Sequence, residues 1–155
     1  MSSPVVRPFG SVGDEPVVRR VGGRALFLGN LHAGDTAIGE RFDHVVSLTA
    51  DPRPATTYHR PLVDGYDVEW PRFADAVDTT RRLHRTDGSV LVHCKAGVSR
   101  SSAVLASTLA AAEGRRFRDA LSEVQAARPI AMPHPGLHEQ AVCYLAVEGI
   151  PSCPE

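Results

Sequence analysis

The chain has 155 residues and a formal net charge of −1, with a sequence pI of about 6.6. This length fits one domain with a substantial core, and the charge balance excludes the strong basic excess typical of nucleic-acid-binding proteins. The longest nearly apolar run, 103–112, is too short to span a bilayer, and the N-terminus lacks the apolar stretch of a signal peptide. We therefore expect a cytoplasmic protein without an integral membrane segment.

The cysteines and histidines do not form a metal-binding pattern. Cys94, Cys143 and Cys153 are odd in number and widely spaced, which fits neither a disulfide framework nor a zinc site. A proline and a glycine separate His134 from His138 and interrupt the helical spacing that would place two ligands on one face. We expect no metal site, a core position for Cys143 among its apolar neighbours, and an exposed Cys153 in a proline-rich tail.

The first half of the chain predicts short strands separated by loops. Residues 1–23 are rich in Pro, Gly, Ser and Arg, which favours a loose N-terminal extension or an edge segment. Apolar runs bounded by turn residues then predict strands over 25–29, 44–49 and 57–62.

The second half is mostly helical. Apolar residues recur near helical spacing over 69–85, which predicts an amphipathic helix, and the apolar run 90–92 predicts a fourth strand. Three further helices are expected over 99–113, 117–127 and 137–147; a glycine follows the first of them and a proline closely follows the second. Strands that alternate with helices, followed by a run of helices, predict an α/β layer domain.

A cysteine lies between the strand 90–92 and the next helix, in the stretch VLVHCKAGVSRSSAV. A helix N-terminus leaves backbone N–H groups unpaired and attracts anions, and a tight loop of such groups forms an anion-binding nest. Ala96 and Gly97 leave room for an oxyanion near this backbone, and Arg100 offers a planar fork that matches two phosphate oxygens. The stretch therefore predicts a phosphate cradle around Cys94.

The same cradle would activate Cys94 as a nucleophile, because nearby positive groups favour the thiolate. We expect sulfur to attack phosphorus and form a phosphocysteine that water hydrolyses. Loop N–H groups and Arg100 would hold the charge on the equatorial oxygens. A buried core cysteine is the alternative for this residue alone, but the arginine, the glycine and the strand–helix setting favour the nucleophile.

The leaving group needs a proton, which a carboxylic acid on a nearby loop could supply before acting as a base toward water. Asp64 and Asp67 both lie in the segment LVDGYDVEW, upstream of the cradle. Asp64 follows the third predicted strand, and Gly65 gives its loop freedom to close. Asp67 lies nearer the next helix, where an acidic residue is an ordinary N-terminal feature, so we favour Asp64 as the general acid.

The segment HCKAGVSRS, residues 93–101, matches the HCxxGxxR[ST] signature of cysteine-dependent protein tyrosine phosphatases. Its form most resembles the dual-specificity subgroup, as do the segments LFLGNLHAGD, FDHVVSLTA and ARPIAMPHPGLHEQ. The resemblance covers roughly residues 24–148. It divides the chain into an N-terminal extension (1–23), a catalytic domain (24–149) and a C-terminal tail (150–155).

The resemblance implies an α/β fold with a central, mostly parallel sheet of four to five strands flanked by helices, and no metal or organic cofactor. Cys94 would be the nucleophile, Arg100 the phosphate-binding arginine and Asp64 the general acid. Ser101 would donate a hydrogen bond to the sulfur, and His93 would hold the shape of the loop. The phosphate-binding loop would comprise His93, Cys94, Lys95, Ala96, Gly97, Val98, Ser99 and Arg100.

These features predict a hydrolase that acts on phosphotyrosine in proteins, with phosphoserine and phosphothreonine as further substrates if the pocket is shallow. A phosphoinositide or other phospholipid head group is the alternative substrate. Val98 stands where one group of inositide phosphatases carries a second lysine, and no basic membrane-binding patch is evident. A rhodanese-like sulfur transferase would not explain Asp64 or the SRS ending. An inactive phosphobinding module would have lost its nucleophile, arginine or acid, whereas Cys94, Arg100 and Asp64 are all present. The sequence leaves the oligomeric state open.

Overall fold

The computed structural model describes residues 15–149, and a five-stranded sheet in the order β1-β2-β5-β3-β4 forms its centre. The strands are β1 (Val18–Arg20), β2 (Leu26–Gly29), β3 (His44–Ser47), β4 (Tyr58–His59) and β5 (Val90–His93). β2, β5, β3 and β4 run parallel, and β1 pairs antiparallel with β2. The expected α/β fold with a mostly parallel sheet is confirmed.

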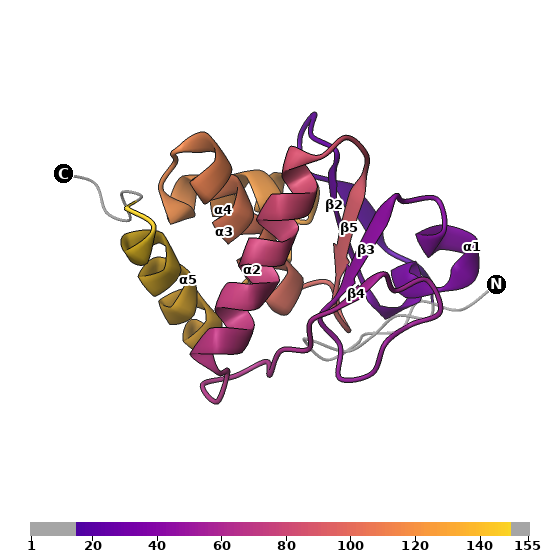
Figure 1. Cartoon of the computed structure of the whole chain (residues 1–155), viewed down its shortest axis with the longest axis horizontal. Coiled ribbons are helices and arrows are strands. Elements are labelled where there is room, and N and C mark those ends of the chain that lie inside the picture. The colour runs from indigo at the N-terminus through magenta and orange to yellow at the C-terminus, as the bar shows by residue number, and fades with distance from the viewer. Residues whose placement is uncertain (1–14, 150–155) are drawn as a thin grey trace.

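Helices cover both faces of this sheet. The long helices are α2 (Trp70–Arg85), α3 (Arg100–Glu113), α4 (Phe117–Ala127) and α5 (Pro135–Val147). They lie on one side, and the short helices η1 (Leu31–Gly34) and α1 (Thr36–Gly39) lie on the other (Figure 1). The larger hydrophobic core therefore lies under the long helices, and a smaller cluster around Val45 and Leu91 lies under α1.

α3 is the central helix, and its residues 101–110 are all buried. Most of its side chains are alanine or serine, which lets neighbouring helices approach closely. Gly114 ends the helix with a φ of 64°, a left-handed conformation that glycine adopts without steric cost. Because α3 is enclosed along most of its length, the loop that precedes it is fixed against the body of the domain.

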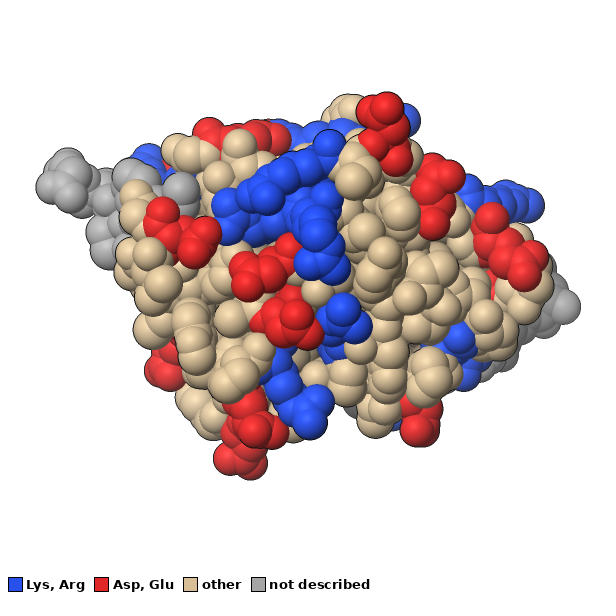
Figure 2. All heavy atoms as spheres, in the orientation of Figure 1, with Lys and Arg blue, Asp and Glu red and all other residues tan. Residues whose placement is uncertain are grey.

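Side chains also tie α2 to α5. Arg81 donates to the hydroxyl of Tyr144 over 2.9 Å and pairs with Glu148 at 2.5 Å. Figure 2 shows arginines gathered over this part of α2 with acidic side chains beside them. This face therefore carries both signs of charge and is not a uniformly basic surface.

The predicted elements differ from the observed ones mainly at their ends. The predicted strand 57–62 shrinks to the two residues of β4, although the N–H groups of Arg60 and Leu62 still donate to the carbonyls of Ser47 and Leu48. α5 begins at Pro135, two residues before its predicted start, since proline suits the first turn of a helix. Val18–Arg20, within the predicted extension 1–23, form an edge strand.

One prediction about a cysteine is wrong. Cys143 is exposed on α5, although its apolar neighbours favoured a core position. α5 carries apolar residues around most of its circumference, so its sequence did not reveal which face is buried. Cys153 lies outside the described residues. Across residues 15–149, the structure has no helix with the length and apolar character needed to cross a bilayer.

Candidate active site

The loop 94–99 joins β5 to α3 at the carboxyl ends of the parallel strands, where open α/β sheets form their binding crevices. Its outer carbonyls are held by neighbouring segments. The backbone N–H of Leu31 donates to the Lys95 carbonyl over 2.9 Å, and that of Met132 donates to the Val98 carbonyl over 2.9 Å. Segments from opposite ends of the chain therefore fix the two sides of the loop.

Arg128 holds the middle of the same loop. Its Nε donates to the Gly97 carbonyl over 3.2 Å, and its Nη2 donates to the Ala96 carbonyl over 3.1 Å. Burial lowers the pKa of Arg128, although an arginine stays charged in proteins. The local sequence around Arg128 indicates no role for this residue, because its contact with the loop exists only in the folded chain.

All four carbonyls from Lys95 to Val98 thus accept hydrogen bonds from outside the loop's own turn. The backbone N–H groups of residues 95–100, in contrast, donate no hydrogen bond to any acceptor within residues 15–149. Unpaired N–H groups in a tight turn before a helix favour an anion. The backbone therefore forms the cradle that an oxyanion requires.

Gly97 gives the loop its shape. Its φ is 68°, and a Cβ at this position would lie 3.2 Å from the Gly29 carbonyl oxygen and 3.3 Å from the Asn30 nitrogen. Because of both the backbone conformation and the close approach, any larger residue at this position would introduce strain.

Asn30, which Gly97 approaches, is itself buried. Its side-chain amide accepts from Val17 N–H over 2.9 Å and donates to the Glu15 carbonyl over 2.9 Å.

Cys94 is only 2% exposed, and its Sγ lies 3.2 Å from the hydroxyl of Ser101 at the start of α3. It lines a pocket of about 100 Å³ whose other lining residues are Asp64, Lys95, Ala96, Val98, Ser99 and Arg100. This volume is below the 300–1,000 Å³ typical of small-molecule sites and suits a phosphoryl group better than a whole cofactor. The serine hydroxyl can donate a hydrogen bond to the sulfur.

His93, the residue before the cysteine, belongs to a buried polar chain. Its Nε2 lies 2.6 Å from the Ser47 hydroxyl, which lies 2.6 Å from the Thr56 hydroxyl. Burial lowers the pKa of His93 to about 4, and the charges of Arg53 and Arg100 act in the same direction. The imidazole is therefore neutral near pH 7, as suits a residue that supports the loop and does not shuttle protons.

Arg100 is the first residue of α3 and reaches across to the loops that follow β3 and β4. Its Nη1 lies 3.3 Å from the carbonyl oxygens of both Leu48 and Leu62. Its buried Nε has no hydrogen-bond partner in the described part of the chain. The guanidinium is therefore held at the pocket with donors to spare for an anion.

The structure brings Asp64, and not Asp67, to the cysteine pocket. Asp64 is exposed and lines the same pocket as Cys94. Asp67 is also exposed, three residues later, but is not among the residues that line this pocket. A proton donor at Asp64 can face a group bound above the sulfur.

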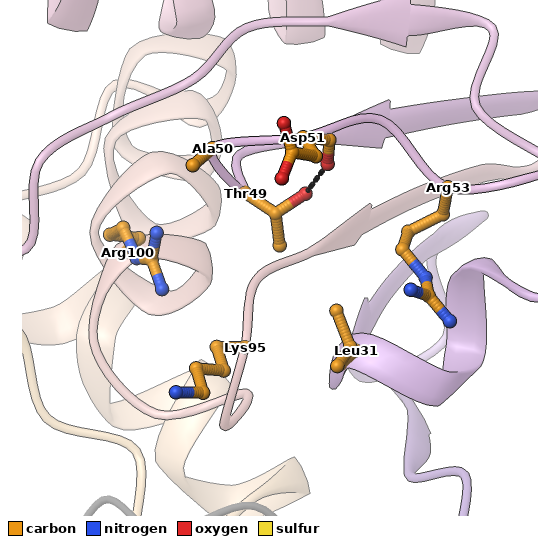
Figure 3. Close-up of a pocket in the computed structure, with 7 residues that line it drawn as sticks. All are labelled: Leu31, Thr49, Ala50, Asp51, Arg53, Lys95 and Arg100. Atoms are coloured by element: carbon orange, nitrogen blue, oxygen red, sulfur yellow. Dashed lines mark hydrogen bonds between the residues drawn. The ribbon is translucent and has the colours of Figure 1, made fainter.

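A second cavity of about 330 Å³ adjoins the first and shares Lys95 and Arg100 with it. Figure 3 shows these two residues on one side of the cavity and Arg53 on the other. Asp51 also lines it, and Arg53 pairs with Asp35 at 2.5 Å. The two carboxylates offset much of the positive charge. The lining residues are Leu31, Thr49, Ala50, Asp51, Arg53, Lys95 and Arg100.

Comparison with known proteins identifies the family of this chain. The family model described as "Dual specificity phosphatase, catalytic domain" matches residues 36–145. Human dual specificity protein phosphatase 15 is 33% identical over 123 residues, which cover 74% of this chain and 42% of the relative. The chain spans about half the length of the first curated relatives that it matches.

Solved structures agree with the sequence match. The crystal structure of human DUSP28 superposes with a TM-score of 0.75 at 26% identity, covering 89% of this chain and 98% of that one. A mouse putative dual specificity phosphatase complexed with zinc tungstate gives 0.73 at 28% identity, covering 92% and 98%. With a phosphate-loop signature, a matching family model and a shared fold, the chain belongs to the dual specificity phosphatase family.

Proposed function

We propose that the chain hydrolyses phosphate monoesters on proteins, through a phosphocysteine formed on Cys94. The observation that carries this proposal is the set of unpaired backbone N–H groups at residues 95–100, which surround a buried thiol. These groups and the guanidinium of Arg100 would bind the three equatorial oxygens of the transferring phosphoryl group. Phosphotyrosine is the proposed principal substrate, with phosphoserine and phosphothreonine as further substrates.

In the first step the Cys94 sulfur attacks phosphorus, the S–P bond forms and the bond from phosphorus to the substrate oxygen breaks. The carboxyl group of Asp64 donates its proton to the departing oxygen. In the second step the Asp64 carboxylate takes a proton from water while the water oxygen attacks phosphorus. The S–P bond then breaks, the Ser101 hydroxyl stabilises the leaving thiolate, and inorganic phosphate is released.

Two further observations support the proposal. Asp64 lines the pocket that contains Cys94, where a proton donor is needed. The tungstate named for the mouse neighbour is a tetrahedral oxyanion, as phosphate is, and that neighbour shares the fold of this chain.

The test combines substrate turnover with detection of the intermediate. Phosphotyrosine, phosphoserine and phosphothreonine peptides of one sequence would be assayed without added metal, and the reaction would be quenched in acid to trap labelled phosphate on the protein. We expect labelled wild type and no labelled Cys94→Ser. Full activity in Cys94→Ser, or turnover without a cysteine adduct, would overturn the mechanism.

A phosphoinositide head group is the second candidate substrate, because the second cavity places Lys95 and Arg53 beside the phosphate loop. Asp51 and the Arg53–Asp35 pair weaken this case by offsetting the positive charge. Parallel assays with soluble phosphoinositides and phosphotyrosine peptides separate the two. A kcat/KM at least about tenfold higher for the lipid head groups would reverse our order of preference.

A further inference from the structure

The loop that carries Asp64 rests on the first turn of α5. The ring of Tyr66 meets the ring of His134 edge to face, with centroids 4.8 Å apart and an interplanar angle of 82°. Beneath this pair, a Cβ on Gly136 would lie 2.6 Å from the Gly65 carbonyl oxygen and 2.8 Å from the Tyr66 Cα. The backbone of the loop therefore packs directly on a position that only glycine leaves open.

The same turn of α5 is bonded to the phosphate loop. The backbone N–H of His134 donates to the Ser99 hydroxyl over 2.8 Å. The His134 side chain caps α5, since its Nδ1 accepts from Gly136 N–H over 3.0 Å. His134 thus links two loops, contacting Ser99 with its backbone and Tyr66 with its ring.

The loop is anchored at its two ends, because buried Leu62 donates to the Leu48 carbonyl over 3.1 Å and accepts from Arg100 over 3.3 Å, and Val68 is buried. Between these ends, little else fixes the position of Asp64. Its carboxylate makes no hydrogen bond or ion pair within residues 15–149, and Tyr66 is 69% exposed. The loop's own backbone bond, from Val68 N–H to the Gly65 carbonyl, is 3.3 Å long. Between the anchored ends, the contact with α5 is therefore the main restraint on where the proposed proton donor stands.

We propose that Tyr66 and His134 are positioning residues that hold Asp64 over the cysteine pocket. This inference rests on the proposed function, because the position of Asp64 matters only if it protonates a leaving group. An edge-to-face aromatic pair contributes enough beyond its area burial to shift the equilibrium of a surface loop about twofold to twelvefold.

The available substitutions separate the ring contact from the helix cap. Tyr66→Phe retains the ring, and Tyr66→Ala removes it. His134→Asn keeps a side-chain acceptor for the cap but loses the imidazole that Tyr66 contacts. Val147→Ala, at the exposed far end of α5, is the matched control.

The experiment measures kcat/KM, which reports the step in which the leaving group departs, for p-nitrophenyl phosphate, whose leaving group needs little protonation, and for phenyl phosphate, whose leaving group needs much. We expect Tyr66→Ala and His134→Asn to lower kcat/KM for phenyl phosphate about fivefold to tenfold, and for p-nitrophenyl phosphate by less than about twofold. Tyr66→Phe and Val147→Ala should match wild type. In an Asp64→Asn background, Tyr66→Ala should have no further effect.

The outcomes separate the two proposals. A wild type that hydrolyses neither aryl phosphate would overturn the proposed function and this inference with it. The positioning role alone would be overturned if the wild type is active but Tyr66→Ala lowers kcat/KM equally for both substrates or for neither. It would also be overturned if Tyr66→Ala still lowers kcat/KM in the Asp64→Asn background.

Discussion

The phosphate loop and the loop that carries Asp64 face the same pocket but are held in opposite ways. Four successive carbonyls of the phosphate loop accept hydrogen bonds from surrounding segments, and its cysteine is 2% exposed. The loop of Asp64 has Val63 and Tyr66 at 50% and 69% exposure and rests on one aromatic contact and one glycine. The fold therefore preorganises the proposed nucleophile and the anion cradle, whereas a surface contact helps to place the proposed proton donor.

This difference predicts a division of effects. Changes in the phosphate loop should lower activity toward every substrate, because all of them present the same phosphoryl group. Changes near Asp64 should act according to the leaving group, because only the departing oxygen differs between substrates.

The largest effect is expected for Cys94→Ser. Replacing the thiol by a poorer nucleophile should lower kcat for all phosphate esters by a factor on the order of 10⁴ or more, while tungstate binding, measured by calorimetry, persists because the cradle is backbone. If tungstate binding were lost as well, the cradle would depend on the sulfur and the contrast between the loops would be wrong.

A buried neutral histidine beneath the phosphate loop predicts an acid-sensitive fold. The pKa of His93 is about 4 in the folded protein, against about 6.5 in the unfolded chain. Between these values only the unfolded chain binds the proton, so the free energy of unfolding should fall by up to about 3 kcal/mol as the pH drops from about 6.5 to about 4. This stability is fully present above pH 6.5.

Urea unfolding across this pH range would test it, with His93→Asn as the comparison. The variant should show a shallower pH dependence. Glu113 also contributes to acid sensitivity, but its hydrogen bond with Arg24 lowers its pKa from the ordinary value. The stability that Glu113 contributes is therefore lost at more acidic pH than that of His93. An unchanged slope in His93→Asn would assign the acid sensitivity to other groups.

Arg128→Met should lower kcat/KM about 100-fold for all aryl phosphates, because the carbonyls of Ala96 and Gly97 lose their donors and the cradle loosens. Arg118→Met is the matched control, since Arg118 is exposed on the same helix region and its side chain makes no hydrogen bond within residues 15–149. A loss of kcat/KM restricted to substrates with poor leaving groups would instead indicate that Arg128 acts on the loop that carries Asp64.

The smallest expected effect is on stability, and it is measured by replacing one glycine in each loop with alanine. Gly97→Ala should destabilise the protein by about 1–3 kcal/mol, because its φ of 68° and its contact with Gly29 both oppose a Cβ. Gly65→Ala should change stability by less than about 1 kcal/mol, since the nearest atom to its Cβ is 4.0 Å away. Chemical denaturation of both variants would measure the difference, and equal losses would contradict it.

The signature segment and the long helices were predictable because their signals are local. A cysteine, an arginine six residues later and a glycine between them specify a loop whose geometry depends mostly on its own residues. α2 and α4 each carry a clear apolar stripe, so helical periodicity marked both within one residue of their observed ends.

Features that depend on distant pairings were not predictable. Val18–Arg20 form a strand only because β2 offers a free edge. The surrounding segment is rich in glycine and arginine, so its sequence does not predict this strand. Arg128 and His134 act on residues about thirty positions earlier or more, and nothing in their local sequence indicates which carbonyl or hydroxyl they meet.

Asn30 connects the short edge strand β1 to the phosphate loop. Its side chain binds the backbone of Val17 and Glu15, and the adjacent Leu31 N–H binds the Lys95 carbonyl of the phosphate loop. β1 covers the edge of β2, and because this new outer strand has only three residues it offers little backbone for pairing with other chains. The same few residues thus shorten the exposed edge of the sheet and, through Asn30, brace the segment that holds the phosphate loop.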